Sequence, residues 1–414
     1  MNCLYNTGIH AYKLLAKLAS VRNKKAKLMI KGQAETFATL QEKLPKGKST
    51  VWVHAASLGE FEQGRTLIEL IKREHPQVNI VLSFFSPSGY EVRKGYEHAD
   101  VVCYLPFDTP KNAKRFINLV NPSMAIFVKY EFWGNYLSEL KKRNVPTFIV
   151  SAIFRPKQIF FRPWGGTFRK MLGCFTTLFV QNEESRKLLI DIGVENVEVT
   201  GDTRFDRVQQ VRDAAREFPT IEAFTANSPF SVVVGSSWQP DEDIIIPFFN
   251  AHPDIKLILA PHEFDTERLD AIKSKITRPV TQYSQVDKEH AGDYDCMIID
   301  TFGILSSLYR YGQVACVGGG FGAGIHNINE AAVYGIPVLF GPKFSKFREA
   351  SDLIACGGGF TFADAAQFNA LMEPLLNDPA KLKRSGNTAS NYIKSHLGAT
   401  KLVYHAIERW LPND

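Results

Sequence analysis

The sequence lacks the paired cysteines that hold zinc or a disulfide framework. Its six cysteines are scattered over 414 residues, with no Cys-x-x-Cys and no close Cys/His pairing. This spacing argues against a structural zinc site and against a disulfide-stabilised scaffold. It suits a reducing compartment, where most of these thiols are expected to be buried and free.

Long apolar runs are missing as well. The long stretch without a charged residue, 311–329, contains six glycines among polar residues, so it predicts loops and turns rather than a membrane helix. A composition of 45% hydrophobic and 22% charged residues is typical of a globular protein. The net charge of +6 is too small and too dispersed to indicate nucleic-acid binding, so no nucleic-acid partner is expected.

Residues 1–35 differ in composition from the rest of the chain. Ile9, Tyr12, Leu15 and Leu18 recur at roughly helical spacing, with lysines and arginines around and after them. This pattern is typical of a basic amphipathic helix that lies in an anionic membrane interface, and it is too charged for a membrane-spanning helix. The alternative is a helix packed on the body of the protein.

The rest of the chain alternates short β-rich runs with amphipathic helical stretches, and the pattern occurs twice. Such alternation predicts parallel sheets with helices on both faces, an α/β fold of two doubly wound, Rossmann-like domains. The expected strands are 51–56, 80–85, 101–105, 124–128, 147–151 and 178–181, then 231–235, 256–260, 297–300, 314–318 and 337–340.

A polar stretch with two prolines, 204–230, separates the two runs and is expected to contain the linker. The predicted domains are therefore the N-terminal helix (1–35), an N-terminal domain (36–207) and a C-terminal domain (208–395). A last helix, 396–414, is expected to pack back on the N-terminal domain.

The stretch HAASLGEFEQGR, 54–65, places Glu60 at a strand-to-helix junction directly after a glycine. Ligands of doubly wound sheets bind at the carboxyl ends of the strands, so this carboxylate should face a cleft. It is a candidate general base. The alternative is a carboxylate that stabilises the positive end of the helix dipole.

A glycine-rich segment in the second half, VACVGGGFGAGIHNINEAAVYGIPVLFGP, is the strongest local motif. A strand should lead into Gly318, Gly319 and Gly320, then Gly322 and Gly324, and a helix is expected to begin near His326 or Asn327. Backbone amides at such a junction can bind a phosphate, and Glu330 can accept hydrogen bonds from ribose hydroxyls. No Gly-Lys-Ser/Thr follows, so this is not a Walker A loop. The alternative is a glycine-rich packing turn.

Together with these two segments, SFFSPSGYE, YLPFDTP, KYEFWGN, GDTRFD and GSSWQPDED occur in the order and at the spacing seen in bacterial 3-deoxy-D-manno-octulosonic acid (Kdo) transferases of lipopolysaccharide assembly. The chain resembles this family from about Trp52 to the end of the second domain. The resemblance implies the GT-B architecture, two Rossmann-like domains facing a central cleft. It also implies transfer of Kdo from CMP-Kdo to a lipid A precursor, lipid IVA.

The family motifs also imply functional residues. The catalytic base falls on Glu60 and a second acidic position falls on Glu131 of KYEFWGN, where Phe132 and Gly134 depart from the family's Leu and Pro. The implied donor-site residues are Gly318, Gly319, Gly320, Gly322, Gly324, His326, Asn327, Glu330, Arg204, His262, Ser236 and Ser237.

Two positions differ from the family pattern. APHEFD stands where the family has Ala-Pro-Arg-His, so the arginine expected to meet phosphate is absent and His262 is the nearest polar substitute. GDTRFD keeps a positive charge at Arg204.

On the acceptor side, Ser86, Ser88 and Gly89 follow a strand and are predicted to bind an acceptor phosphate, with a structural turn as the alternative. Arg155 lies in a segment that mixes basic and aromatic residues, 153–170, which suits a lipid headgroup. The alternative there is a partly exposed helix entry.

The chemistry fits these residues. A sugar hydroxyl needs one base as it attacks, and CMP leaves as a stabilised anion helped by amides, a helix dipole and a cation such as Arg204 or Lys346. Direct displacement predicts inversion, with neither a covalent nucleophile nor a metal cofactor. Asp241–Asp243 resembles a metal-binding DxD motif, and His262 with Glu263, Asp265 and Glu267 also suggests a metal site. The favoured interpretation of both groups is carboxylates that stabilise the start of a helix.

The sequence thus predicts an inverting, metal-independent Kdo transferase at the cytoplasmic face of the bacterial inner membrane. One alternative is another GT-B enzyme acting on a nucleotide sugar, such as a hexosaminyl transferase or an epimerase. The other is a non-catalytic nucleotide-binding protein of the same fold, against which a carboxylate at the cleft argues.

Overall fold

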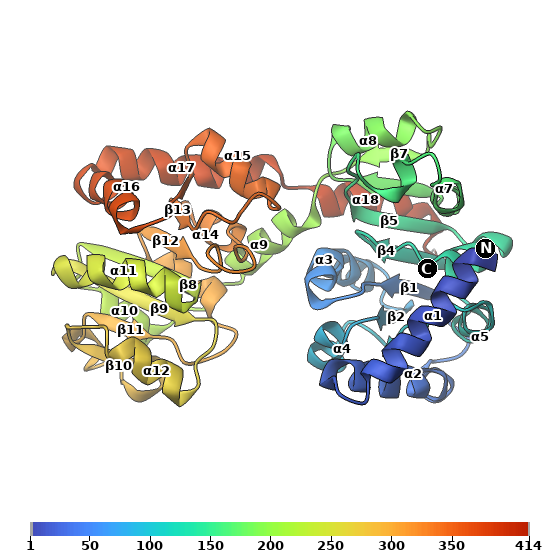
Figure 1. Ribbon diagram of the computed structural model, residues 1–414, viewed down its shortest axis with the longest axis horizontal. Coiled ribbons are helices and arrows are strands. Elements are labelled where there is room, and N and C mark those ends of the chain that lie inside the picture. The colour runs from blue at the N-terminus through green and yellow to red at the C-terminus, as the bar shows by residue number, and fades with distance from the viewer. Residues whose placement is uncertain (1–2, 413–414) are drawn as a thin grey trace. The chain divides into compact units, whose positions relative to one another are not determined.

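The computed structural model describes residues 3–412. The chain forms two compact units (Figure 1). One comprises the residues up to Arg207 together with those from Leu397 onward, and the other comprises Val208–His396. Each unit is an α/β domain built on one seven-stranded sheet, so the predicted class of fold is confirmed.

The N-terminal sheet has the strand order β3-β2-β1-β4-β5-β6-β7, and its described pairings are parallel. Its strands are β1 (Thr50–His54), β2 (Asn79–Phe84), β3 (Val101–Tyr104), β4 (Met124–Val128), β5 (Thr147–Ala152), β6 (Thr177–Val180) and β7 (Val197–Val199). The order reverses beside β1, so β1 and β4 border the point where doubly wound folds bind ligands.

Helices cover both faces of this sheet. They are α1 (Cys3–Ala19), α2 (Lys24–Lys43), α3 (Leu58–Glu74), α4 (Pro87–Arg93), α5 (Pro110–Val120), α6 (Gly134–Lys142), α7 (Gly166–Leu172) and α8 (Glu183–Ile190), with α18 (Ala399–Ile407) near the C-terminus and short 3-10 turns at Ile159–Phe161 and Glu408–Trp410. The next helix, α9 (Thr203–Asp213), begins in this unit and ends in the other. Because side chains alternate along a strand, Val51 and Val53 of β1 pack in the cluster that contains α3 and α18 residues, whereas Trp52 packs among residues of α5 and α6.

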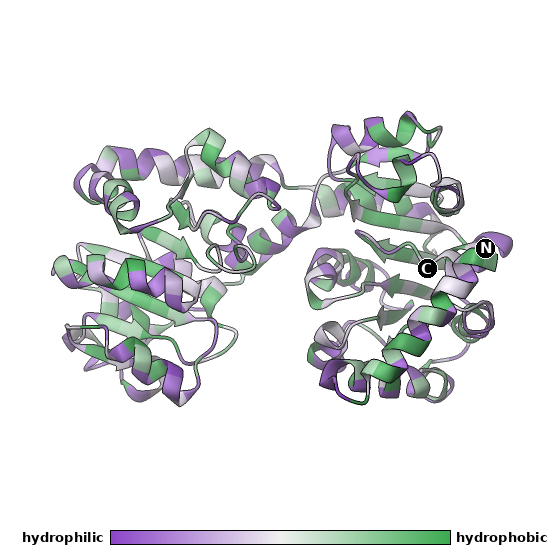
Figure 2. Ribbon diagram, in the orientation of Figure 1, coloured by the Kyte–Doolittle hydropathy of each residue, from purple (hydrophilic) through white to green (hydrophobic). Residues whose placement is uncertain are grey.

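The N-terminal segment forms two helices where the sequence suggested one. Asn23 ends the first run because its side chain accepts a hydrogen bond from the Ala26 amide and caps α2. Met29 and Leu40 of α2 are buried, so α2 is packed on the body of the unit. Along α1 green hydrophobic residues alternate with hydrophilic ones (Figure 2), and Leu14, Leu15 and Leu18 are exposed.

The C-terminal sheet has the order β10-β11-β9-β8-β12-β13-β14, again with parallel pairings. Its strands are β8 (Phe230–Ser237), β9 (Ile255–Pro261), β10 (Val280–Gln282), β11 (Cys296–Ile298), β12 (Val314–Val317), β13 (Val338–Phe340) and β14 (Gly359–Thr361). The helices are α10 (Pro219–Thr225), α11 (Gln239–Ala251), α12 (Thr266–Lys273), α13 (Leu305–Leu308), α14 (Asn329–Ala332), α15 (Arg348–Cys356), α16 (Ala365–Asn377) and α17 (Pro379–Ser395), with 3-10 turns at Tyr283–Gln285, Ala291–Asp293 and Tyr309–Tyr311.

The stretch between the sheets is largely helical. Its first part, α9, is held at its start in the N-terminal unit, where Asp206 accepts hydrogen bonds from the amides of Gly398 and Thr400 at 2.6 Å each. These contacts bring the end of the chain back to that unit, and α18 packs there against α3 (Figure 1).

Candidate active site

Glu60 lies in the first turn of α3, just after the carboxyl end of β1. Its Oε2 atom accepts a hydrogen bond from the Ser57 amide at 3.1 Å, so the carboxylate is held over the strand end as an N-terminal cap. Burial raises the pKa of Glu60 to about 7, and the charge of Glu131 adds to this. His54 and the amides of Ala56 and Ser57 oppose the rise. A carboxyl group with a pKa near 7 is suited to take a proton at neutral pH.

Glu131 lies in the loop after β4 and is 7% exposed. Its Oε2 atom is 2.9 Å from Nε2 of His54, the last residue of β1, and 2.6 Å from the indole nitrogen of Trp133. On the other side of the imidazole, Nδ1 is 3.0 Å from the carbonyl oxygen of Ser83, which faces His54 across β1 and β2. The structure therefore brings Glu60 and Glu131 together and adds a buried histidine beneath them.

The backbone is strained near the ends of β4 and β5. Lys129, directly after β4, has a φ of 65°, and Ser151 near the end of β5 has a φ of 50°. Both angles lie in the left-handed region that non-glycine residues avoid, and such strain clusters at functional sites. The turn at Lys129 leads directly into Tyr130 and Glu131, so it sets the direction of the acidic loop.

Arg204 lies in the N-terminal unit, at the start of α9. It pairs with the buried carboxylate of Asp202 at 2.7 Å. Burial of Asp202 acts against ionisation, but Arg204 and the Gln63 amide outweigh it and lower the pKa of Asp202. Arg204 and Asp202 also act electrostatically on Tyr130, together with Arg155 and Glu60. The predicted cation thus lies within the electrostatic neighbourhood of the predicted base.

The side chains of Ser86 and Ser88 interact with each other at the start of α4. Ser86 Oγ accepts a hydrogen bond from the Ser88 amide at 3.3 Å, and the two hydroxyl oxygens are 3.0 Å apart. A Cβ atom at Gly89 would lie 2.2 Å from the Phe84 ring, so this glycine is needed for packing. These contacts account for the serines and the glycine as a structural turn, and their acceptor role stays a prediction.

Arg155 borders an aromatic cavity of about 470 Å³ in the N-terminal unit. Its lining residues are Tyr130, Phe132, Arg155, Gln158, Ile159, Phe160 and Phe168. Tyr130 links this cavity to the acidic site, since the charges of Glu60 and Arg155 both act on its hydroxyl. An apolar pocket with one guanidinium at its edge fits a ligand that carries both an anionic and an apolar group.

The glycine-rich loop of the C-terminal unit differs from the expected phosphate cradle. The amides of Gly318, Gly319, Gly322 and Gly324 all donate to protein acceptors. Close approach accounts for three of these glycines, Gly318, Gly319 and Gly324, and for Gly320. A Cβ atom at Gly318 would lie 2.3 Å from the Ser236 carbonyl oxygen, and one at Gly320 would lie 2.6 Å from the Gly341 backbone. Gly319 also has a φ of 92°, a backbone conformation that residues other than glycine rarely adopt. Packing and turn geometry therefore explain much of this motif.

The helix after the loop is also shorter than expected. It begins at Asn329 and has four residues, so Glu330 lies in its first turn rather than one turn inside it. The side-chain amide of Asn327 donates to Glu330 Oε1 at 2.9 Å. The structure thus brings Asn327 and Glu330 together, while only a short helix contributes a dipole toward a phosphate.

His262 and His326 are neighbours at the carboxyl ends of β9 and β12. Their ring centroids are 4.7 Å apart, and Trp238 stacks on His262 at 4.6 Å. Burial lowers the pKa of His326, and His262 lowers it further. Ser236 and Ser237 are the last two residues of β8, and Ser236 has a φ of 52°. The backbone of both residues lies against Gly318, next to this cluster. Three aromatic rings in contact offer a stacking surface for a planar group.

The acidic motif at the start of α11 is a helix cap. Asp241 Oδ2 accepts hydrogen bonds from the amides of Trp238 at 2.9 Å and Gly319 at 3.1 Å, and buried Glu242 pairs with Arg268 at 2.6 Å. Asp265 caps α12 in the same way, through the Arg268 amide. Both arrangements agree with carboxylates at helix starts. Within residues 3–412, no group of three or more histidine, cysteine, aspartate or glutamate side chains is arranged to hold a metal ion.

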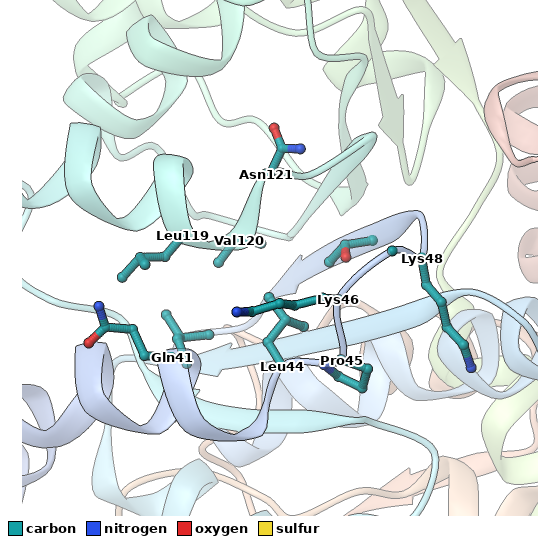
Figure 3. A pocket seen from close by; sticks show the side chains of 11 residues that line it. Gln41, Leu44, Pro45, Lys46, Lys48, Leu119, Val120 and Asn121 are labelled. Carbon is teal, nitrogen blue, oxygen red and sulfur yellow. The ribbon is translucent and has the colours of Figure 1, made fainter.

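A second cavity of about 470 Å³ lies at the opposite edge of the N-terminal sheet (Figure 3). Lys46, Lys48, Leu44 and Asn121 border it, together with Thr50, the first residue of β1. Active sites of doubly wound folds form at the carboxyl ends of strands, so this cavity is not part of the candidate site.

The chain matches the model of the 3-deoxy-D-manno-octulosonic-acid transferase (kdotransferase) family over residues 31–207. It is 27% identical over 351 residues to a 3-deoxy-D-manno-octulosonic acid transferase of Aquifex aeolicus, which covers 83% of this chain and 90% of that relative. A Bordetella pertussis protein of the same name is 27% identical over 382 residues, 87% of each chain. The predicted resemblance to the Kdo transferase family is confirmed. It supports glycosyltransferase activity.

The Kdo transferase match covers the part of the chain that contains Glu60 and Glu131. Among solved structures, a UDP-GlcNAc 2-epimerase from Neisseria meningitidis bound to UDP-GlcNAc has a TM-score of 0.60 and 13% identity, covering 87% of this chain and 100% of that one. At this identity the likeness concerns the fold, which agrees with the GT-B class that the Kdo transferase motifs predict.

Three residues of the site were not predicted from the sequence. His54 begins the stretch that contains Glu60, Trp133 follows Glu131 by two residues, and Trp238 follows Ser237 directly. Each lies close in the sequence to a residue that was predicted, and this closeness was the only sequence signal that could have identified it. Their roles depend on contacts between separate strands, which spacing along the chain does not reveal.

Proposed function

We propose that this protein transfers Kdo from CMP-Kdo to the lipid A precursor lipid IVA, with inversion at the anomeric carbon and Glu60 as the general base. The observation that carries the proposal is the position of Glu60 at the end of β1, with a pKa raised to about 7. A base is most effective when its pKa lies near the working pH. The resemblance to the Kdo transferase family, which spans most of the chain, supports the choice of donor and acceptor.

The acceptor hydroxyl loses its proton to Glu60 as it attacks, and CMP departs as an anion. The anion is stable without protonation, so the reaction needs one base and groups that stabilise negative charge. In the N-terminal unit, Arg204 is such a group near the base. In the C-terminal unit, His262, His326 and the polar pair Asn327 and Glu330 are the proposed contacts for CMP. We propose that no metal ion takes part.

Acceptor recognition is assigned to the aromatic cavity bordered by Arg155. Lipid IVA combines an anionic group with acyl chains, and the cavity combines a guanidinium with Phe132, Ile159 and Phe160. A cation next to apolar side chains is the arrangement that binds such amphiphiles.

The proposed location is the cytoplasmic face of the inner membrane, where an acceptor of this kind is inserted. No helix within residues 3–412 is long and apolar enough to cross a bilayer. The proposal rests on α1, whose exposed Leu14, Leu15 and Leu18 accompany the basic residues of the first thirty positions. Apolar and basic side chains together bind anionic lipid surfaces.

The test is transfer from CMP-Kdo, generated in situ, to purified lipid IVA in the presence of EDTA, followed by mass spectrometry. A lipid product heavier by one or more Kdo units supports the donor, the acceptor and metal independence together. Folded protein that neither releases CMP nor modifies the lipid contradicts the proposal and favours another nucleotide-sugar reaction. Release of CMP without a lipid product contradicts the acceptor alone.

A further inference from the structure

Both nitrogens of His54 are engaged, although the residue lies completely inside the N-terminal unit. Its side chain is 0% exposed. Nδ1 lies 3.0 Å from the Ser83 carbonyl oxygen and 2.9 Å from the Ser83 hydroxyl oxygen, so it donates to Ser83 when it carries a proton and accepts from the Ser83 hydroxyl when it does not. Nε2 then faces the Glu131 carboxylate at 2.9 Å.

The contact between His54 and Glu131 requires a proton between Nε2 and Oε2, which a neutral imidazole supplies when Nδ1 accepts from the Ser83 hydroxyl. With Nδ1 protonated, a hydrogen bond forms if the second proton is on Nε2, giving an ion pair, or on Glu131, giving a neutral pair. In both cases the pair has no net charge. If that proton is lost, a buried negative charge remains, which is unfavourable in a low-dielectric site.

Trp133 contacts both members of this pair. Its indole nitrogen is 2.6 Å from Glu131 Oε2 and 3.0 Å from His54 Nε2. An indole nitrogen can only donate a hydrogen bond. Its N–H therefore stabilises negative charge on the Glu131 carboxylate oxygen and holds that oxygen toward the imidazole. The imidazole is likewise oriented by Ser83, which comes from the neighbouring strand.

We propose that His54 is a positioning residue that shares one proton with Glu131 and so prevents Glu131 from presenting a full negative charge to Glu60. The inference rests on the proposed function, in which Glu60 takes the proton of the acceptor. Without His54, the unpaired charge of Glu131 holds a proton on Glu60 and leaves it unable to act as a base until the pH is higher.

Other charged groups act in the same region, and three of them, Asp202, Arg204 and Arg155, are present in every variant considered below. The titratable and charged groups that face Glu60 and its neighbour Tyr130 are His54, Glu131, Asp202, Arg204 and Arg155. Of these, His54 and Glu131 are joined by a hydrogen bond, as are Asp202 and Arg204, but His54 and Glu131 are the two whose charges act on Glu60 itself. Replacing either of them therefore changes the local charge in a defined direction.

The experiment compares the pH dependence of kcat/KM for Kdo transfer in the wild type, His54→Gln, Glu131→Gln and the double variant. Activity should rise with pH as Glu60 ionises. We expect the midpoint of this rise to move up by about one pH unit in His54→Gln and down in Glu131→Gln, with the double variant close to the wild type, because a single charge at short range shifts a carboxyl pKa by at least that much.

A purely structural role for His54 gives a different result. Loss of packing lowers activity at all pH values without moving the midpoint, and this outcome overturns the inference, as does a shift of both single variants in the same direction. His75→Gln is the matched control, since this histidine also bonds a neighbour, the Tyr404 hydroxyl, but does not contact the site. Its midpoint should equal that of the wild type.

A second measurement needs no transfer activity. Trp133 touches both members of the pair, so its emission, obtained as the difference from Trp133→Phe, reports their protonation over a pH titration. We expect a titration step that moves in His54→Gln. An unchanged step contradicts proton sharing even if transfer is observed, whereas a moved step without any transfer supports the pair and contradicts the proposed function alone.

Discussion

Asp241 Oδ2 accepts a hydrogen bond from the Gly319 amide at 3.1 Å, and this contact joins the start of α11 to the glycine-rich loop after β12. The same oxygen accepts from the Trp238 amide. Asp241 is 1% exposed, so its two hydrogen bonds form away from water. The carboxylate therefore holds the loop to the residues that carry Trp238, and with them the proposed CMP contacts.

We expect Asp241→Ala to destabilise the C-terminal unit and to weaken binding of CMP. Removing the carboxylate leaves the buried Gly319 amide and the partly buried Trp238 amide without their acceptor, which costs about 1–3 kcal/mol. Thermal unfolding with and without CMP, together with calorimetric titration of CMP, measures both effects.

The control for this prediction is Asp243→Ala, two residues further along α11. Asp243 is exposed and pairs with Lys275 at 2.5 Å, a surface pair that contributes little. Equal losses of CMP affinity in the two variants would show that the contact with Gly319 does not organise the loop.

Glu60→Gln should retain CMP binding and lose turnover by about 10²–10⁴-fold, the usual contribution of a general base. In the wild type, activity should be low below pH 7 and level off above it, because the pKa of Glu60 is raised to about 7 and only the ionised form accepts a proton. A pH series of kcat/KM with lipid acceptor measures this. Near-normal turnover of Glu60→Gln contradicts the assignment of the base.

The same substitution should make the protein more stable at alkaline pH. Below the ordinary pKa of 4.5, Glu60 is protonated in the folded and unfolded chain and has no effect on stability. Between pH 4.5 and about 7 the unfolded chain ionises first, so stability falls as the pH rises, and above 7 the loss is constant. Glu60→Gln avoids this loss.

Melting temperatures at pH 5 and pH 8 test the stability effect. The gain of Glu60→Gln over the wild type should be larger at pH 8. A matched control is Glu69→Gln on the same helix, whose carboxylate pairs with Arg65 at 2.7 Å and should lose stability rather than gain it. An equal effect of Glu60→Gln at both pH values contradicts a raised pKa at this position.

The fold was predictable because its central strands are long and apolar. Strands such as β1 and β4 form five-residue buried runs between helices, and this pattern indicates a doubly wound sheet. The three strands absent from the prediction, β7, β10 and β14, have three residues each and lie at sheet edges. The strands β11 and β13 are equally short but were predicted because all their residues are apolar, whereas β7, β10 and β14 each contain polar residues, so no apolar run marks them.

The candidate site was predictable in part. Glu60 and Glu131 lie 71 positions apart in the sequence, yet both follow central strands, and parallel strand ends meet at one edge of a sheet. The pairing of His54 with Glu131 and the use of the Gly319 amide by Asp241 depend on side-chain directions, which motif spacing does not encode. The glycine-rich loop was therefore expected to bind a phosphate through its backbone amides, but several of those amides already donate to protein acceptors.

Arg155→Gln should raise the KM for the lipid acceptor about fivefold and leave CMP binding unchanged, because a partly exposed charge pair contributes about 1 kcal/mol or less. The reason is that Arg155 provides the cation at the edge of the aromatic cavity. Steady-state kinetics with lipid IVA at saturating donor measures the change. Arg162→Gln is the control, an exposed arginine of the same segment outside the cavity lining, and an equal rise in both variants contradicts a specific acceptor contact.

Leu15→Ser combined with Leu18→Ser should weaken binding to anionic lipid vesicles more than tenfold without changing the fold. Both leucines are 63% exposed on α1, so they contribute little to the core and can enter a lipid surface, where burial of one such side chain is worth about 1.5–3 kcal/mol. Co-sedimentation with phosphatidylglycerol vesicles at two salt concentrations measures binding and its electrostatic part, which should fall as salt screens the lysines. The matched control is Val92→Ser with Leu402→Ser, two residues 57% and 55% exposed on α4 and α18. If this control loses as much binding, or if the α1 variant binds as the wild type does, α1 is not the membrane-binding element.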